Sequence, residues 1–179
     1  RFDYRGHGLS SGDFLDGNIS SWTADCLAAL DELTDGPQVL VGSSLGGWLM
    51  LNVALTRPTR IVGLIGIAAA PDFTEDLLWA EFDDEQRRRI EADGVTALPN
   101  PYSDEPVRYP WHLVTDGRRN LRLRGNLEIN APVHLLHGME DQEVPWQTAT
   151  RIAAALTGSN VEVSLVKSAG HRFSEPDQL

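Results

Sequence analysis

Cysteine is almost absent from this sequence, which excludes an internal disulfide. The chain of 179 residues carries a single cysteine, Cys26, and a disulfide needs two. With one thiol beside five histidines, no cysteine–histidine zinc site is expected. A helix is predicted to start at Ser20 or Ser21, and Cys26 lies on its apolar stripe with Trp22, Ala29, Leu30 and Leu33. We therefore interpret it as an inert core residue.

Basic residues and long apolar runs are also scarce. The chain has 15 Lys and Arg against 26 Asp and Glu, a net charge of −11, so nucleic acid and anionic membranes would repel it. The longest apolar run, residues 61–71, suits a buried strand and is too short to span a bilayer. A hydrophobic content of 41% is enough for one core. We expect a cytoplasmic location, or the mitochondrial matrix if the source is eukaryotic.

The sequence also lacks an initiator methionine. It opens with Arg1-Phe2-Asp3-Tyr4, which is typical of the end of a strand. We therefore expect an incomplete chain whose first strands precede Arg1. A targeting peptide upstream is compatible with this expectation.

A serine flanked by glycines stands between an apolar strand and a helix. Val39-Leu40-Val41 predicts the strand, and the apolar pattern over 45–56 predicts the helix. Between them, Gly42-Ser43-Ser44-Leu45-Gly46 has the spacing of a nucleophile elbow with Ser44 at its apex. Ser43 is out of register for this role. The glycines would let the neighbouring backbone approach closely.

Two further strands each lead into a residue that could activate Ser44. The strand over 133–137 leads into a loop with Asp141, and the strand over 161–166 leads into a loop with His171. A histidine oriented by an acid takes the proton of a serine and makes it a nucleophile. The backbone N–H of Leu45, at the start of the helix, is the candidate oxyanion donor. A second donor is expected upstream of the chain.

Other residues compete for the role of the acid. Asp72 follows the predicted strand over 61–68, and some triads draw their acid from this position. Glu140 and Glu143 lie beside Asp141. We favour Asp141, because His-Gly-x-x-Asp followed by Val-Pro places it one turn past its strand. The remaining histidines are interpreted as loop, lid or strand-end packing residues: His7, His112, His134 and His137.

The region between the second and third strands is predicted to be a lid. It contains a charged helix over 83–92, a proline-rich stretch over 99–110 and a further segment over 111–124. We expect a core formed by residues 1–71 and 129–179 and a lid formed by residues 72–128, because ligands enter parallel sheets at the carboxyl ends of the strands.

Two kinds of lid side chain could contact a substrate. An acyl pocket could be lined by Trp79, Trp111, Tyr102 and Leu113, although packing of the lid explains them equally well. Arg118 and Arg119 could bind a carboxylate, since arginine pairs with it bidentately. A solvated basic face is the alternative.

The order Ser44, Asp141, His171 is that of α/β-hydrolases, and the sequence resembles this superfamily along the whole chain. Residues 2–10 resemble the segment after the fourth strand of the fold, and residues 35–50 and 135–139 are similar to a group of thioesterases and acyl-glucuronide esterases. The resemblance implies a mostly parallel sheet with crossover helices and a helical lid.

It also implies a serine hydrolase that cleaves carboxylic esters or thioesters through an acyl-enzyme, on a small-molecule or acyl-protein substrate. No cofactor or metal is implied. Two alternatives stay open: a non-catalytic ligand-binding or receptor protein of the same fold, and a carbon–carbon bond hydrolase, because fold alone does not determine function.

Overall fold

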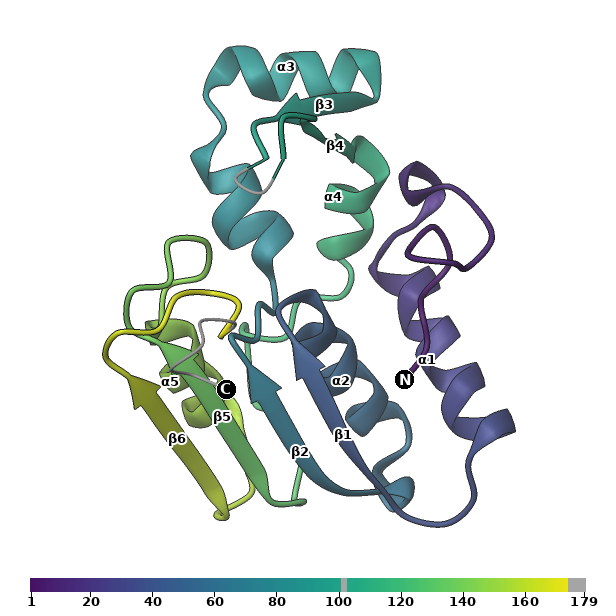
Figure 1. The fold of residues 1–179 in the computed structure, drawn as a ribbon, viewed down its shortest axis with the longest axis vertical. Coiled ribbons are helices and arrows are strands. Elements are labelled where there is room, and N and C mark those ends of the chain that lie inside the picture. Colours follow the sequence, from purple (N-terminus) through teal and green to yellow (C-terminus); the bar gives the residue numbers. More distant parts are fainter. Residues whose placement is uncertain (101–102, 174–179) are drawn as a thin grey trace. The chain divides into compact units, whose positions relative to one another are not determined.

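The computed structural model describes residues 1–100 and 103–173 (Figure 1). The chain forms two compact units: Arg1–Leu33 with Asp72–Asn120, which we call the helical unit, and Thr34–Pro71 with Leu121–Leu179, which we call the sheet unit. The division into a core and a lid stays a prediction. In the part of the chain that the structure describes, no helix is both long and apolar enough to cross a membrane.

Four parallel strands build the sheet unit, in the order β1-β2-β5-β6. The strands are β1 (Gln38–Ser43), β2 (Ile61–Ile67), β5 (Val133–Gly138) and β6 (Val161–Val166). All four are predicted from the sequence. Ala68 adopts a φ of 45° and ends β2 one residue earlier than predicted. Because parallel strands share their direction, the loops after them gather at one edge of the sheet.

Helices α2 (Leu45–Thr56) and α5 (Gln147–Ala155) cover one face of this sheet (Figure 1). α2 packs against β1 and β2, and α5 packs against β5 and β6. Residues 47–54 of α2 are all buried, and apart from Asn52 they are glycine or apolar residues. The opposite face of the sheet leaves Val39, Val41 and Ile65 exposed. The core of the unit therefore lies between the sheet and its two helices.

The helical unit combines helices with a two-stranded hairpin. Its elements are a 3₁₀ helix (Phe14–Asp16), α1 (Ile19–Leu33), a π-helix (Thr74–Trp79), α3 (Asp84–Asp93), β3 (Val95–Leu98), β4 (Val107–Pro110) and α4 (Trp111–Gly117). β3 and β4 pair antiparallel. β4 lies within the proline-rich stretch predicted over 99–110 and β3 lies just before it; neither strand is predicted from the sequence.

Helix α3 confirms the charged helix that the sequence predicts. Asp83 accepts the Gln86 N–H at 2.7 Å, and the Gln86 side chain accepts the Asp83 N–H at 2.9 Å. This reciprocal pair is a capping box, which satisfies two backbone groups at the helix start. Gly94, with a φ of 74°, ends the helix in the left-handed conformation.

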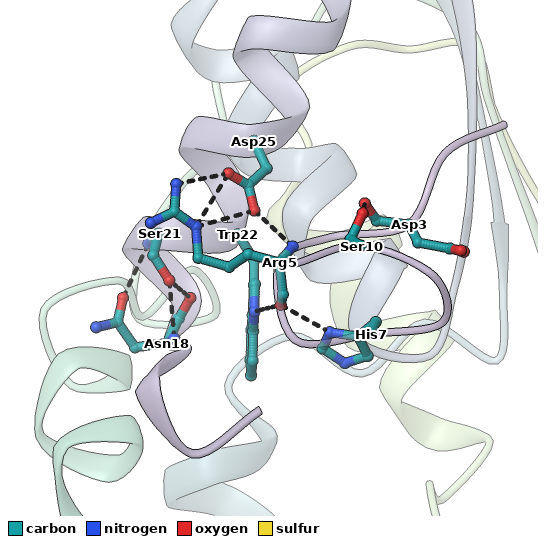
Figure 2. A network of polar contacts seen from close by, with 8 residues as sticks. All are labelled: Asp3, Arg5, His7, Ser10, Asn18, Ser21, Trp22 and Asp25. Atoms are coloured by element: carbon teal, nitrogen blue, oxygen red, sulfur yellow. Dashed lines mark hydrogen bonds and ion pairs between the residues drawn. The ribbon is translucent and has the colours of Figure 1, made fainter. Parts of the chain in front are cut away.

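Helix α1 begins earlier than predicted, because its cap is Asn18 rather than Ser20 or Ser21. The Asn18 Oδ1 accepts the Ser21 N–H at 2.8 Å, and the Ser21 Oγ accepts the Asn18 N–H at 2.9 Å (Figure 2). These two bonds satisfy backbone groups that the helix leaves open at its first turn.

The loop before α1 is tied to this helix through Arg5. The Arg5 N–H donates to Asp25 at 3.0 Å, and the guanidinium pairs with the same carboxylate at 3.1 Å (Figure 2). The indole N–H of Trp22 donates to the Arg5 carbonyl at 3.2 Å.

On helix α1, burial raises the pKa of the Cys26 thiol to about 12. The thiol is therefore protonated at neutral pH, as expected of an inert residue. Leu33 is 76% exposed, and the prediction that it belongs to the core stripe is wrong.

Candidate active site

Ser44 occupies the turn between β1 and α2 in a backbone conformation that L-residues rarely adopt. Its φ is 51° and its ψ is −120°. Neighbouring backbone fixes it there: its N–H donates to the Ile67 carbonyl at 2.9 Å, and its carbonyl accepts the Ala70 N–H at 3.0 Å. Such strain persists only where the surrounding structure imposes it, and it is common at active sites. Ser43 is the last residue of β1 and is exposed.

Two glycines allow the elbow to pack closely. A Cβ on Gly42 would lie 2.4 Å from the Gly46 carbonyl oxygen, and a Cβ on Gly47 would lie 2.4 Å from the Cβ of Ala69. The sequence motif draws attention to Gly42 and Gly46, whereas the structure identifies Gly47 as a second point of close approach. Only glycine fits at either of these positions.

His171 joins Ser44 to Asp141 in one row of hydrogen bonds. The Nε2 of His171 lies 3.0 Å from the Oγ of Ser44, and its Nδ1 lies 2.8 Å from the Oδ2 of Asp141. With its hydrogen on Nδ1, the ring donates to the carboxylate and accepts the hydroxyl hydrogen of Ser44. The three residues follow β1, β5 and β6 at the carboxyl edge of the sheet. The structure thus brings together the three residues that the sequence selects.

The Asp141 side chain is fully buried, and hydrogen bonds keep it charged. Its Oδ1 accepts the backbone N–H groups of Glu143 and Val144, both at 2.9 Å. Burial by itself raises the pKa of the Asp141 carboxyl, but the hydrogen bonds from Val144, His171 and Glu143 outweigh it and hold the pKa below its ordinary value of 3.8. A charged carboxylate therefore faces His171.

The competing acids occupy other positions. Nδ1 of His171 lies 2.8 Å from the Oδ2 of Asp141, and a hydrogen on this nitrogen would point to that carboxylate. Glu143 Oε2 lies 3.9 Å from Nε2, on the opposite side of the ring. Glu140 is exposed. Asp72 is buried and belongs to the helical unit. Its backbone φ is 63°, and it lies just before the π-helix that starts at Thr74.

A second histidine contacts Asp141, which the sequence does not predict. The Nε2 of His137 lies 3.2 Å from the Oδ2 of Asp141 and 3.0 Å from the Val144 carbonyl oxygen. Its side chain is fully buried at the end of β5. The sequence analysis treats His137 as a packing residue. The one available signal is its position four residues before the candidate acid.

Leu45, the candidate oxyanion donor, is the first residue of α2. The N–H groups in the first turn of a helix have no acceptor within that helix. The positive end of the helix dipole therefore lies directly after Ser44, where negative charge on a substrate oxygen would be stabilised.

Three of the side chains predicted to contact a substrate, Trp79, Trp111 and Arg118, take part in the packing of the helical unit. The Arg118 guanidinium carbon lies 4.7 Å from the ring centre of Trp79 and 5.3 Å from that of Trp111. Its Nε also pairs with Glu75 at 2.7 Å. Arg119 is exposed. Substrate contact by these four residues stays a prediction.

The two tryptophans pack against a buried apolar cluster of Leu78, Phe82, Ile90 and Val114. Leu113 is buried, and Tyr102 lies outside the described residues. Within residues 1–100 and 103–173, no group of three His, Cys, Asp or Glu side chains is placed to hold a metal ion.

Comparison with known protein families matches residues 1–179 to the alpha/beta hydrolase family. The chain belongs to this family. It is 40% identical over 176 residues to the human mitochondrial palmitoyl-protein thioesterase ABHD10, which covers 98% of this chain and 57% of that protein. The bovine protein of the same name is 39% identical, with the same coverage. The chain thus spans less than two thirds of the length of these relatives.

Two solved structures share the fold at similar identity. A putative hydrolase from Agrobacterium vitis S4 superposes with a TM-score of 0.94 at 39% identity, covering 99% of this chain and 70% of that one. The mouse alpha/beta hydrolase domain-containing protein 10 superposes with a TM-score of 0.90 at 38% identity, covering 99% and 71%. The α/β-hydrolase fold predicted from the sequence is confirmed.

Proposed function

We propose that the protein containing this chain is a serine hydrolase of carboxylic thioesters and esters, with Ser44, His171 and Asp141 as its catalytic triad. The observation that carries the proposal is the row of hydrogen bonds, 3.0 Å from Ser44 to His171 and 2.8 Å from His171 to Asp141. The curated relatives are named palmitoyl-protein thioesterases. This favours a long-chain acyl thioester on a protein as the substrate.

Acylation begins when the Ser44 oxygen attacks the acyl carbon and its proton passes to Nε2 of His171. The Asp141 carboxylate, bonded to Nδ1, stabilises the imidazolium that forms. The Leu45 N–H is placed to stabilise the negative oxygen of the tetrahedral intermediate. The leaving thiol or alcohol takes the proton from Nε2, and the acyl group remains on Ser44.

Deacylation repeats these steps with water. Water gives a proton to Nε2 as it attacks the acyl carbon, and the second tetrahedral intermediate breaks down to the free acid. Ser44 recovers its proton from His171. Every proton in the cycle passes through Nε2 of His171. Both steps therefore depend on the distance between this atom and the Oγ of Ser44.

Two further activities can use the same three residues as thioester hydrolysis and are distinguished from it by their substrates. An acyl-glucuronide or other carboxylic ester uses the same acyl-enzyme chemistry, and a carbon–carbon bond hydrolase can use the same three residues. A non-catalytic ligand-binding protein has no need of a complete row, and in this chain the row is complete.

A fluorophosphonate probe on the intact protein tests the proposal. We expect labelling of Ser44, loss of labelling and of hydrolysis in Ser44→Ala, and retention of most of both in Ser43→Ala. Labelled peptide that maps to Ser43 would refute the assignment of the nucleophile. A panel of palmitoyl and shorter acyl thioesters, matched oxygen esters and an acyl glucuronide then ranks the substrate classes. Labelling without turnover of any of them would refute the proposed ester and thioester hydrolysis and favour the carbon–carbon bond hydrolase or the non-catalytic alternative.

A further inference from the structure

Asp141 shares one carboxylate oxygen between two imidazole rings. Oδ2 lies 2.8 Å from the Nδ1 of His171 and 3.2 Å from the Nε2 of His137. The side chains of Asp141 and His137 are 0% and 1% exposed, so water does not replace either contact. The proposed mechanism uses only the first of these rings.

The hydrogen on the His137 ring can be placed from its partners. Nε2 faces the carboxylate of Asp141 and, at 3.0 Å, the carbonyl oxygen of Val144. Both groups accept hydrogen bonds and cannot donate them, so Nε2 carries the hydrogen and shares it between them. Nδ1 of His137 is buried with no partner within hydrogen-bond distance. A second hydrogen on Nδ1 would lack an acceptor, and the ring therefore fits its site with one hydrogen only.

This arrangement fixes both oxygens of the acid. Oδ1 is held by the N–H groups of Glu143 and Val144. Without His137, Oδ2 would be held by His171 alone among the described contacts, and only the two bonds to Oδ1 would oppose a turn of the carboxylate with that ring. His137 also bonds the Val144 carbonyl, so it ties the end of β5 to the loop that carries Asp141.

We infer that His137 is a positioning residue of the triad, which holds the Oδ2 of Asp141 in the direction of His171 by donating a second hydrogen bond to it. This inference rests on the proposed function, because it assigns a role within the same catalytic row. Loss of His137 should affect turnover rather than substrate binding, because His137 is buried and contacts the acid Asp141.

Three variants in the intact protein test this role. His137→Met removes the hydrogen-bond donor and keeps an apolar side chain of similar length; a carboxylate displaced by a fraction of an ångström would lower kcat by about 10- to 100-fold, with KM unchanged. In His137→Gln, the amide nitrogen reaches the place of Nε2, so most of kcat should return. In His137→Asn, the amide falls short, so kcat should stay low. His134→Met is the control, because His134 lies on the same strand, is exposed and bonds Ser164 instead.

A spectroscopic measurement separates this inference from the proposed function. The NMR signal of the hydrogen between His171 and Asp141 reports the geometry of that bond without any substrate. We expect it to move in His137→Met and His137→Asn, and to keep its wild-type position in His137→Gln and His134→Met. An unmoved signal in the Met and Asn variants, with kcat unchanged in folded protein, would overturn the positioning role. If the Met variant fails to fold, the Gln and Asn pair decides. If no substrate is turned over, the signal still decides the geometry while the proposed function fails.

Discussion

Replacing Gly42 by alanine should damage the elbow, because the added Cβ has no room. It would lie 2.4 Å from the Gly46 carbonyl oxygen, 2.7 Å from its carbon and 2.8 Å from the Gly47 nitrogen. All three atoms are backbone of the turn and of the first turn of α2, so no side-chain rotation relieves the contact. The end of β1 and the start of α2 must separate by about half an ångström or more to reach the shortest distance that folded proteins tolerate.

The size of the effect follows from this shift. Overpacking of this kind costs about 1–3 kcal/mol of stability, and for a domain of 150–250 residues each kcal/mol lowers Tm by roughly 2–4 °C. Ser44 lies between the two displaced elements, so its oxygen moves relative to His171, from which it is now 3.0 Å. Misplacement of a reacting group by about 1 Å costs roughly 100-fold in rate. We expect kcat of Gly42→Ala to fall by about 10- to 100-fold.

Gly63→Ala is the matched control, since it makes the same chemical change on the neighbouring strand β2. A Cβ there would lie 3.4 Å from the Val39 side chain, which is ordinary contact. Thermal unfolding and probe labelling of both variants provide the measurements. If Gly42→Ala is as stable and as reactive as Gly63→Ala, the close approach at Gly42 is not what shapes the elbow.

Three further predictions concern charged side chains. Asp141→Asn should lower kcat by roughly 10,000-fold, as loss of the acid does in other triads. Asp72→Asn should lower kcat far less. Steady-state kinetics that show the reverse order would identify Asp72 as the acid. The lowered pKa of Asp141 means that its contribution to stability is present above the unfolded value and is lost as pH falls through the lower folded value. Acid unfolding of wild type should therefore include a component below pH 3.8 that Asp141→Asn lacks, and identical acid profiles would contradict this. Arg118→Ala should destabilise the helical unit by about 1 kcal/mol through lost stacking and pairing, while Arg119→Ala, an exposed neighbour, should not; equal melting curves would argue against the packing role of Arg118.

Strand–turn–helix patterns carry most of what can be predicted from this sequence. β1, β2, β5 and β6 are short apolar runs, and their signal is local. The order of Ser44, Asp141 and His171 along the chain then assigns each to the end of a different strand. Parallel strands bring those ends to one edge, so the grouping of the three residues can be predicted without coordinates.

Other features depend on contacts that sequence periodicity does not encode. The β3–β4 hairpin is formed by two four-residue strands, in which alternation is too short to detect. Asn18, Ser20 and Ser21 are all residue types that suit a helix N-cap. Only the hydrogen bonds in the structure show that Asn18 occupies this position. The contact of His137 with Asp141 requires the loop after β5 to fold back on the strand, which the sequence does not show.

The backbone at Ser44 limits which amino acid can act as the nucleophile. Its φ of 51° lies where a residue with a branched Cβ is a steric outlier. Threonine carries the same hydroxyl group, but its extra methyl would force the turn to open, so Ser44→Thr should lose the row of hydrogen bonds even though its chemistry is unchanged. Cysteine is unbranched and should keep the turn. The nucleophilic atom at this position can therefore be oxygen or sulfur, but the side chain that carries it must be unbranched at Cβ.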